Sequence, residues 1–168
     1  MVDPESRVHD AHHDALRLWL RLFTCSQLIE RVIRARLRRD FNTTLPRFDL
    51  MAQLERNPGG LKMSELSKRL LVTGGNVTGI TDQLVAEGLV RREPIEGDRR
   101  AFSVRLTPKG KRGFDAMAAA HERWVIELMA GMNGSKRNAL YSLLGQFKRG
   151  LRSESPRKSR YLKAIDGP

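Results

Sequence analysis

Residues 88–108 change the hydrophobic period of the chain, and this change constrains the fold more than any other feature. Apolar residues alternate with polar ones over 102–106, which is the period of a β-strand. Residues 90–93 predict the partner strand, and the proline and glycine within 94–98 predict the turn between the two. The segments on either side have helical spacing, so the sequence predicts a mainly α-helical chain with one β-hairpin.

Helices are predicted where apolar residues recur at spacings of three and four. The expected ranges are 10–39, 45–56, 64–71, 73–88, 107–130 and 135–151. Residues suited to capping mark their ends, because Ser and Thr accept hydrogen bonds at a helix start, proline fits the first turn, and glycine suits the end. These residues are Thr44, Pro46, Thr73, Gly88, Thr107, Pro108 and Ser135.

Three short helices followed by a hairpin predict a winged helix-turn-helix. The third of these helices begins at Thr73 and carries a buried stripe of Val77, Ile80 and Leu84. An α-helix fits the major groove of DNA, and a hairpin can reach the neighbouring backbone or minor groove. We therefore expect this segment to bind duplex DNA.

The charge of the chain agrees with this expectation. Lys and Arg number 31 against 19 Asp and Glu, which gives a net charge of +12. Eight basic residues and only three acidic ones lie between Arg91 and Arg112. Such a field favours an acidic partner. We expect double-stranded DNA in this role and no membrane, because the apolar runs are only a few residues long.

Several other classes of protein are excluded. Cys25 is the only cysteine in the sequence, so one chain can build neither a disulfide framework nor a cysteine-based zinc site. No pattern of nucleophile, base and acid indicates an enzyme, and we expect no metal and no cofactor. The N-terminus lacks the features of a signal peptide, so we expect a cytoplasmic, nucleoid-associated bacterial protein.

Six motifs resemble the MarR family of winged-helix regulators. They are Leu66-Ser67-Lys68-Arg69-Leu70, Val77-Thr78, Asp82-Gln83-Leu84, Glu87-Gly88-Leu89-Val90-Arg91-Arg92, Asp98-Arg99-Arg100-Ala101 and Leu106-Thr107-Pro108-Lys109-Gly110. The resemblance implies a homodimer in which each winged helix meets one half of a palindromic operator. It also implies a dimerisation helix, a DNA-binding domain and further dimerisation helices. A fourth region, the basic tail, lacks apolar periodicity and is expected to be disordered. Their expected ranges are 10–40, 44–106, 107–152 and 153–168.

The resemblance assigns DNA contacts to the third short helix and to the wing. The expected residues are Thr73, Gly74, Asn76, Thr78, Asp98, Arg99 and Arg100. Arg99 is expected to enter the minor groove, and Asp82 is expected to form a structural ion pair with Arg100. Gly79 stands where many family members carry arginine, so Asn76, whose amide suits adenine, becomes the expected base reader.

Residues 45–54 and 73–82 look similar to the family branch that controls aromatic-acid degradation, some members of which respond to aryl-CoA thioesters. This similarity implies a repressor that a small aromatic or aryl-CoA ligand releases from DNA. The implied pocket lies between the first helix, the second helix and the helix after the wing. Its expected lining residues, each of which could instead serve core or dimer packing, are Trp19, Phe23, Arg36, Phe48, Met51 and Trp124.

Two alternative functions remain open at this point. One branch of the family senses peroxide through a cysteine on its first helix, which requires an accessible thiol with a lowered pKa. Cys25 lies on the apolar stripe of that helix, so we expect it to be buried instead. The second alternative is a sequence-tolerant architectural protein, which would bind operator and random DNA with similar affinity.

Overall fold

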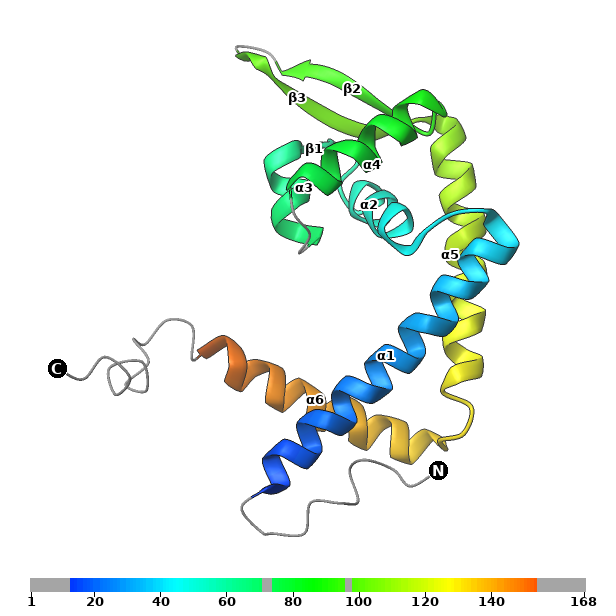
Figure 1. Ribbon diagram of the computed structural model, residues 1–168, viewed down its shortest axis with the longest axis vertical. Helices are drawn as coiled ribbons and strands as arrows, with labels where there is room; N and C mark the ends of the chain where they lie inside the picture. Colours follow the sequence, from blue (N-terminus) through cyan, green and yellow to red (C-terminus); the bar gives the residue numbers. More distant parts are fainter. Residues whose placement is uncertain (1–12, 71–73, 96–97, 154–168) are drawn as a thin grey trace, which may run out of the picture. The chain divides into compact units, whose positions relative to one another are not determined.

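The computed structural model describes residues 13–70, 74–95 and 98–153, and the side chains within 13–70, 76–95 and 102–151. These residues form six helices and one antiparallel sheet of three strands, which confirms a mainly α-helical fold with a hairpin (Figure 1). In chain order the elements are α1 (Asp14–Phe41), α2 (Leu45–Glu55), β1 (Leu61–Lys62), α3 (Met63–Leu70), α4 (Gly74–Ala86), β2 (Val90–Ile95), β3 (Asp98–Leu106), α5 (Pro108–Leu128) and α6 (Gly134–Ser153).

Two compact units make up the structure, divided between Trp124 and Val125. The first unit holds α1 to α4, the sheet and most of α5, and the second holds α6. The four regions expected from the sequence are functional divisions, so their boundaries stay a prediction. The expected tail lies outside the described residues from position 154 onward. Thr73, the expected cap of α4, also lies outside them.

The hairpin is longer than predicted. β2 continues to Ile95 and β3 starts at Asp98, so the turn is shorter than the expected residues 94–98. The sheet order is β1-β3-β2, which makes β2 an edge strand. An edge strand tolerates Pro94 because the missing N–H need not face a partner, and the register is irregular directly after it.

The short strand β1 was not predicted. Gly60 has a φ of +85°, and its N–H donates to the Asn57 carbonyl oxygen at 2.8 Å. This turn places Leu61 opposite Val104 in β3. A strand of two residues has no period of its own, so it arises from pairing with a distant segment rather than from local sequence.

The core of the first unit lies among α2, α3, α4 and the sheet. The predicted stripe of α4 is confirmed, because Val77, Ile80 and Leu84 are all buried. Thr81 is also fully buried, and its Oγ1 donates to the Val77 carbonyl oxygen at 2.8 Å. Other fully or almost fully buried residues are Leu37, Leu50, Met51, Leu54, Leu66, Val90 and Val104.

Three of the Ser and Thr residues predicted to cap helix N-termini can be compared with the structure. Thr107 is confirmed, because its Oγ1 accepts a hydrogen bond from the Gly110 N–H at 3.0 Å. Thr44 precedes α2 as predicted, although its side chain makes no capping hydrogen bond. Ser135 is wrong as the cap of α6. Asn133 takes this role, since its Oδ1 accepts the Lys136 N–H at 2.9 Å.

Within the first unit, the buried residues of α1 are Ile33 and Leu37, near its C-terminal end. The predicted burial of Cys25 is therefore wrong for the single chain, because this residue is exposed. Leu18 and Phe23 on the same half of the helix are also more than half exposed. None of the helices in the described part of the chain combines the length and hydropathy needed to cross a membrane.

Candidate nucleic-acid interface and cavity

The helix α4 presents a polar face opposite its buried stripe. Because Val77 and Ile80 point into the core, Asn76 and Thr78 are exposed on the other side. A Cβ atom built on Gly79 would meet no atom within 4 Å, so the surface between them is open. Gly74 starts the helix beside this face. Asn76 and Thr78, two of the DNA contacts expected from the sequence, thus share an accessible stretch of α4.

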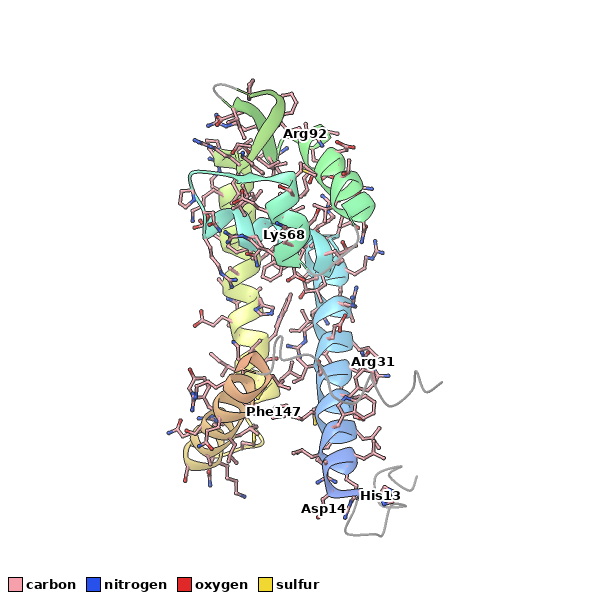
Figure 2. All side chains as sticks on the ribbon, turned by 90° about the vertical axis from the view of Figure 1, so that its left-hand side faces the viewer. His13, Asp14, Arg31, Lys68, Arg92 and Phe147 are labelled. Atoms are coloured by element: carbon pink, nitrogen blue, oxygen red, sulfur yellow. The ribbon has the colours of Figure 1, made fainter. Side chains whose placement is uncertain are left out.

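An ion pair ties α4 to the hairpin. Arg92 Nη2 on β2 lies 2.5 Å from Asp82 Oδ1, with the two side chains 34% and 54% exposed. Arg92 is labelled in Figure 2. Asp82 therefore joins the helix to the wing, but through Arg92. The side chains of Asp98, Arg99 and Arg100 lie outside the described residues, so the Asp82–Arg100 pair and the wing contacts stay predictions.

Most of the basic residues between Arg91 and Arg112 contact other groups of the protein. Glu93 forms ion pairs at 2.9 Å with both Arg91 and Arg105. The residues engaged within the chain are Arg91, Arg92, Arg105, Lys109 and Lys111. The charge count of this segment thus overestimates the number of cations that are free of contacts within the chain.

The turn Glu87–Leu89, which connects α4 to β2, is held from two sides. Gly88 ends α4 with a φ of +70°, as predicted, and the Leu89 N–H donates to the Leu84 carbonyl oxygen at 2.9 Å. From the start of α5, Thr107 Oγ1 donates to the Gly88 carbonyl oxygen at 2.7 Å, and Lys109 Nζ donates to that of Glu87 at 2.9 Å.

From α2, Arg47 donates to the carboxylate of Glu87 in the same turn. The position of α4 therefore depends on α2 as well as on α5. The sequence offered one local signal for this arrangement, the cap formed by Thr107, and none for the contact with Arg47.

A cavity of about 380 Å³ lies among α2, the end of α3 and α5. Its apolar wall includes Phe48 and Phe114, whose rings stack at 5.5 Å, and His121, whose ring lies 5.1 Å from that of Phe48. The remaining lining residues are Asp49, Ala52, Gln53, Arg56, Arg69, Leu70 and Ala118. This combination can hold an aromatic ring against one wall and an anionic group near the arginines.

The structure divides the six expected pocket residues into separate groups. Phe48 lines the cavity. Met51 is buried in the core. The Trp124 ring lies 6.1 Å from that of Phe41, and the Arg36 guanidinium lies over the Trp124 ring at 5.9 Å. The remaining two residues, Trp19 and Phe23, stack at 5.8 Å on the exposed part of α1. The rise of an α-helix puts Trp19 about 25 Å from Arg36 along α1.

Sequence reasoning missed Asp49, Arg56, Arg69, Phe114 and His121 as cavity residues. A signal was present on α5, where residues 111, 114, 118 and 121 follow a spacing of three and four that places them on one face. The sequence alone does not say that this face meets α2. Among the described residues, no cluster of three or more His, Cys, Asp or Glu side chains could hold a metal ion.

Burial raises the pKa of the Asp49 carboxyl, and the nearby charges of His121 and Arg34 oppose this shift. Because the folded-state pKa exceeds the unfolded value, ionised Asp49 costs stability once the pH rises through the folded-state pKa. We expect Asp49→Asn to match the wild type near pH 3.5 and to melt at a higher temperature at about pH 7. Thermal melting at both pH values checks this. Asp14→Asn, an exposed control on α1, should show no such gain, and an equal gain for both variants would contradict the explanation.

Comparison with known proteins adds to the geometry. A family model described as MarR family matches residues 41–101, which run from the end of α1 into β3. The crystal structure of a MarR family transcriptional regulator from Silicibacter pomeroyi superposes with a TM-score of 0.72 and 30% sequence identity. The match covers 86% of this chain and 99% of that one.

Two curated relatives are similar over shorter stretches. The HTH-type transcriptional repressor NicR of Pseudomonas putida is 37% identical over 90 residues, which are 53% of this chain and 56% of NicR. The HTH-type transcriptional regulator PecS of Dickeya dadantii is 28% identical over 106 residues, which are 62% of this chain and 64% of PecS. The chain thus spans less than two thirds of either relative.

Proposed function

The chain belongs to the MarR family of transcription regulators, a family of regulators and not of enzymes, and we propose that it is a sequence-specific DNA-binding regulator of transcription. One observation carries the proposal: an accessible polar face of α4 is tied by the Arg92–Asp82 ion pair to the hairpin formed by β2 and β3. A helix and hairpin fixed in this way suit the major groove and the adjacent backbone or minor groove.

The proposed contacts are divided between the two elements. α4 lies in the major groove, where Asn76 reads adenine and Thr73, Gly74 and Thr78 approach the bases or phosphates. The wing, with Asp98, Arg99 and Arg100, reaches the backbone, and Arg99 enters the minor groove. We place this activity in the cytoplasm, at the nucleoid.

The proposed functional unit is a homodimer on a palindromic operator. Each compact unit exposes apolar side chains that a second copy could cover. In the first unit these are Leu16, Leu18, Trp19, Phe23 and Leu28 on α1. In the second unit they are Leu140, Leu143, Leu144, Phe147 and Leu151 on α6. Apolar residues at this density on helix surfaces are typical of interfaces between subunits.

The proposed regulatory signal is a small aromatic ligand, with aryl-CoA thioesters as one candidate class. The cavity supports this, because Phe48, Phe114 and His121 form an aromatic wall and Arg56 lies at its edge. Since α2 and α5 both line the cavity and both hold the turn after α4, a ligand that prefers a different spacing of these helices would shift the population away from the DNA-binding state. The protein would then act as a repressor.

Cys25 is exposed in the single chain, which keeps oxidation of its thiol as a second candidate signal if the dimer leaves it accessible. A gel shift on the DNA upstream of the protein's own gene distinguishes the signals. Aromatic acids, their CoA thioesters and peroxide are added in parallel, to the wild type and to Cys25→Ser. Release by an aromatic compound in both proteins supports the ligand. Release by peroxide in the wild type alone supports the redox signal.

Asn76→Ala tests the DNA-binding proposal itself. We expect about tenfold weaker binding to the operator, because one bidentate base contact is lost, with unchanged binding to random DNA. Fluorescence anisotropy on both duplexes at one salt concentration measures the two affinities. Gln83→Ala, exposed on the same helix two turns later, is the control and should bind as the wild type does. Equal wild-type affinity for both duplexes would instead indicate the architectural alternative.

A further inference from the structure

Arg47 joins the start of α2 to the turn that follows α4. Its Nη2 donates to Glu87 Oε2, and the Arg47 side chain is only 16% exposed, against 47% for Glu87. The same turn is already held by Thr107 and Lys109 from the start of α5. Arg47 thus adds a contact from a second helix to a segment that directly sets the end of α4.

The location of Arg47 is unfavourable for stability in two respects. It lies in the first turn of α2, where a positive charge opposes the helix macrodipole and where no acidic residue of the same turn accompanies it. Its Nε is buried and has no hydrogen-bond partner among the described residues. Both conditions offset the gain from the ion pair with Glu87, so that stability alone does not account for this arginine.

The ion pair of Arg47 with Glu87 also has a geometric effect, because it fixes the orientation of α4. Asp82 and Arg92 fix one side of α4 to the hairpin, and Arg47 and Glu87 fix its C-terminal end to α2. Hydrogen bonds to base edges tolerate only a few tenths of an ångström in length. Contacts of a cation with the phosphate backbone depend less on orientation, because they are largely electrostatic.

We propose that Arg47 is a positioning residue for DNA recognition: by holding Glu87, it orients α4 and sets the preference for the operator over other DNA without touching DNA itself. The inference rests on the proposed DNA binding. It assigns to Arg47 a role in specificity. It also implies that α2, which lines the cavity, helps to orient the helix that contacts the bases.

The test compares affinities for two duplexes over a series of salt concentrations. One duplex is selected by the wild-type protein from a random-sequence pool, and the other contains the same bases in shuffled order. Arg47→Met is expected to lower the ratio of the two affinities about tenfold, an effect like that of one lost base contact. Affinity for the shuffled duplex and the salt slope should stay unchanged, because no phosphate contact is removed.

Two further variants separate orientation from folding. Glu87→Gln removes the same ion pair from an exposed position and should lower the ratio similarly. The combination of Arg47→Glu with Glu87→Arg should restore it to within about threefold, because each new charge also suits its helix end. Circular dichroism melting of every variant shows that it is folded.

Lys111→Met is the matched control. Lys111 on α5 forms an ion pair at 3.1 Å with Glu55 on α2, and one at 2.6 Å with Asp115 on its own helix, but neither pair involves the turn after α4. It should keep the wild-type ratio. The proposal is overturned by an unchanged ratio in Arg47→Met, by an equal loss in Lys111→Met, or by a salt slope lowered by about one phosphate contact. A wild type that fails to prefer the selected duplex instead refutes the proposed function.

Discussion

Gly110→Ala is expected to lower the free energy of unfolding by about 3 kcal/mol, at the upper end of the usual cost of overpacking. A Cβ atom at this position would lie 1.8 Å from the carbonyl oxygen of Leu89 and 2.8 Å from its carbonyl carbon. These are backbone atoms, so no side-chain rotation relieves the clash. The same oxygen accepts the Thr107 N–H at 3.0 Å, and moving it would also break this contact between α5 and the turn after α4.

Urea denaturation of Gly110→Ala and of Gly113→Ala measures this effect against a matched control. Both glycines lie in α5, but a Cβ on Gly113 would meet no atom within 4 Å. Gly113→Ala should therefore be more stable than the wild type by up to about 1 kcal/mol, because alanine favours the helix. Similar stabilities for the two variants would mean that the close approach of α5 to Leu89 does not constrain the fold.

Phe147→Gln combined with Leu144→Gln is expected to convert the proposed dimer into a monomer and to weaken operator binding by about 100-fold or more. Both side chains are exposed on α6, and with Leu140 and Leu151 they follow a spacing of four, three and four that forms one stripe. A dimer binds the two half-sites of an operator together, and the loss of this linkage is worth about 10² to 10⁴ in affinity.

Sedimentation velocity reports the oligomeric state, and a gel shift on the operator reports the affinity. Ser142→Gln serves as the control, because residue 142 is exposed on the opposite side of α6. It should leave both readouts unchanged. A double variant that remains dimeric would move the dimer interface away from the stripe on α6.

The parts of the fold that sequence predicts well are those specified by neighbouring residues. Gly88 ends α4 because a left-handed residue is needed there, and Thr107 starts α5 because its hydroxyl lies within reach of the Gly110 N–H. The hairpin follows from its own alternation. The misplaced cap of α6 is also local, since Asn133 and Ser135 are both good capping residues and only the path of the loop decides between them.

The parts that sequence misses depend on distant residues. The strand β1 exists because Leu61 meets Val104, and Asp82 meets Arg92 because the hairpin folds back over α4. The cavity needs α2 and α5 side by side, so His121 had no visible role in the sequence. Cys25 shows the reverse error, because an apolar stripe indicates burial without saying whether the cover comes from the same chain.

Glu93 has a consequence for the time the protein spends on the wrong DNA. By pairing with both Arg91 and Arg105, it neutralises charge on the strands of the hairpin while the net charge of the chain remains +12. Affinity for arbitrary DNA grows with the number of phosphates that unpaired cations neutralise. If the proposed DNA binding holds, we expect this pairing to shorten the time that the protein spends at each non-cognate site.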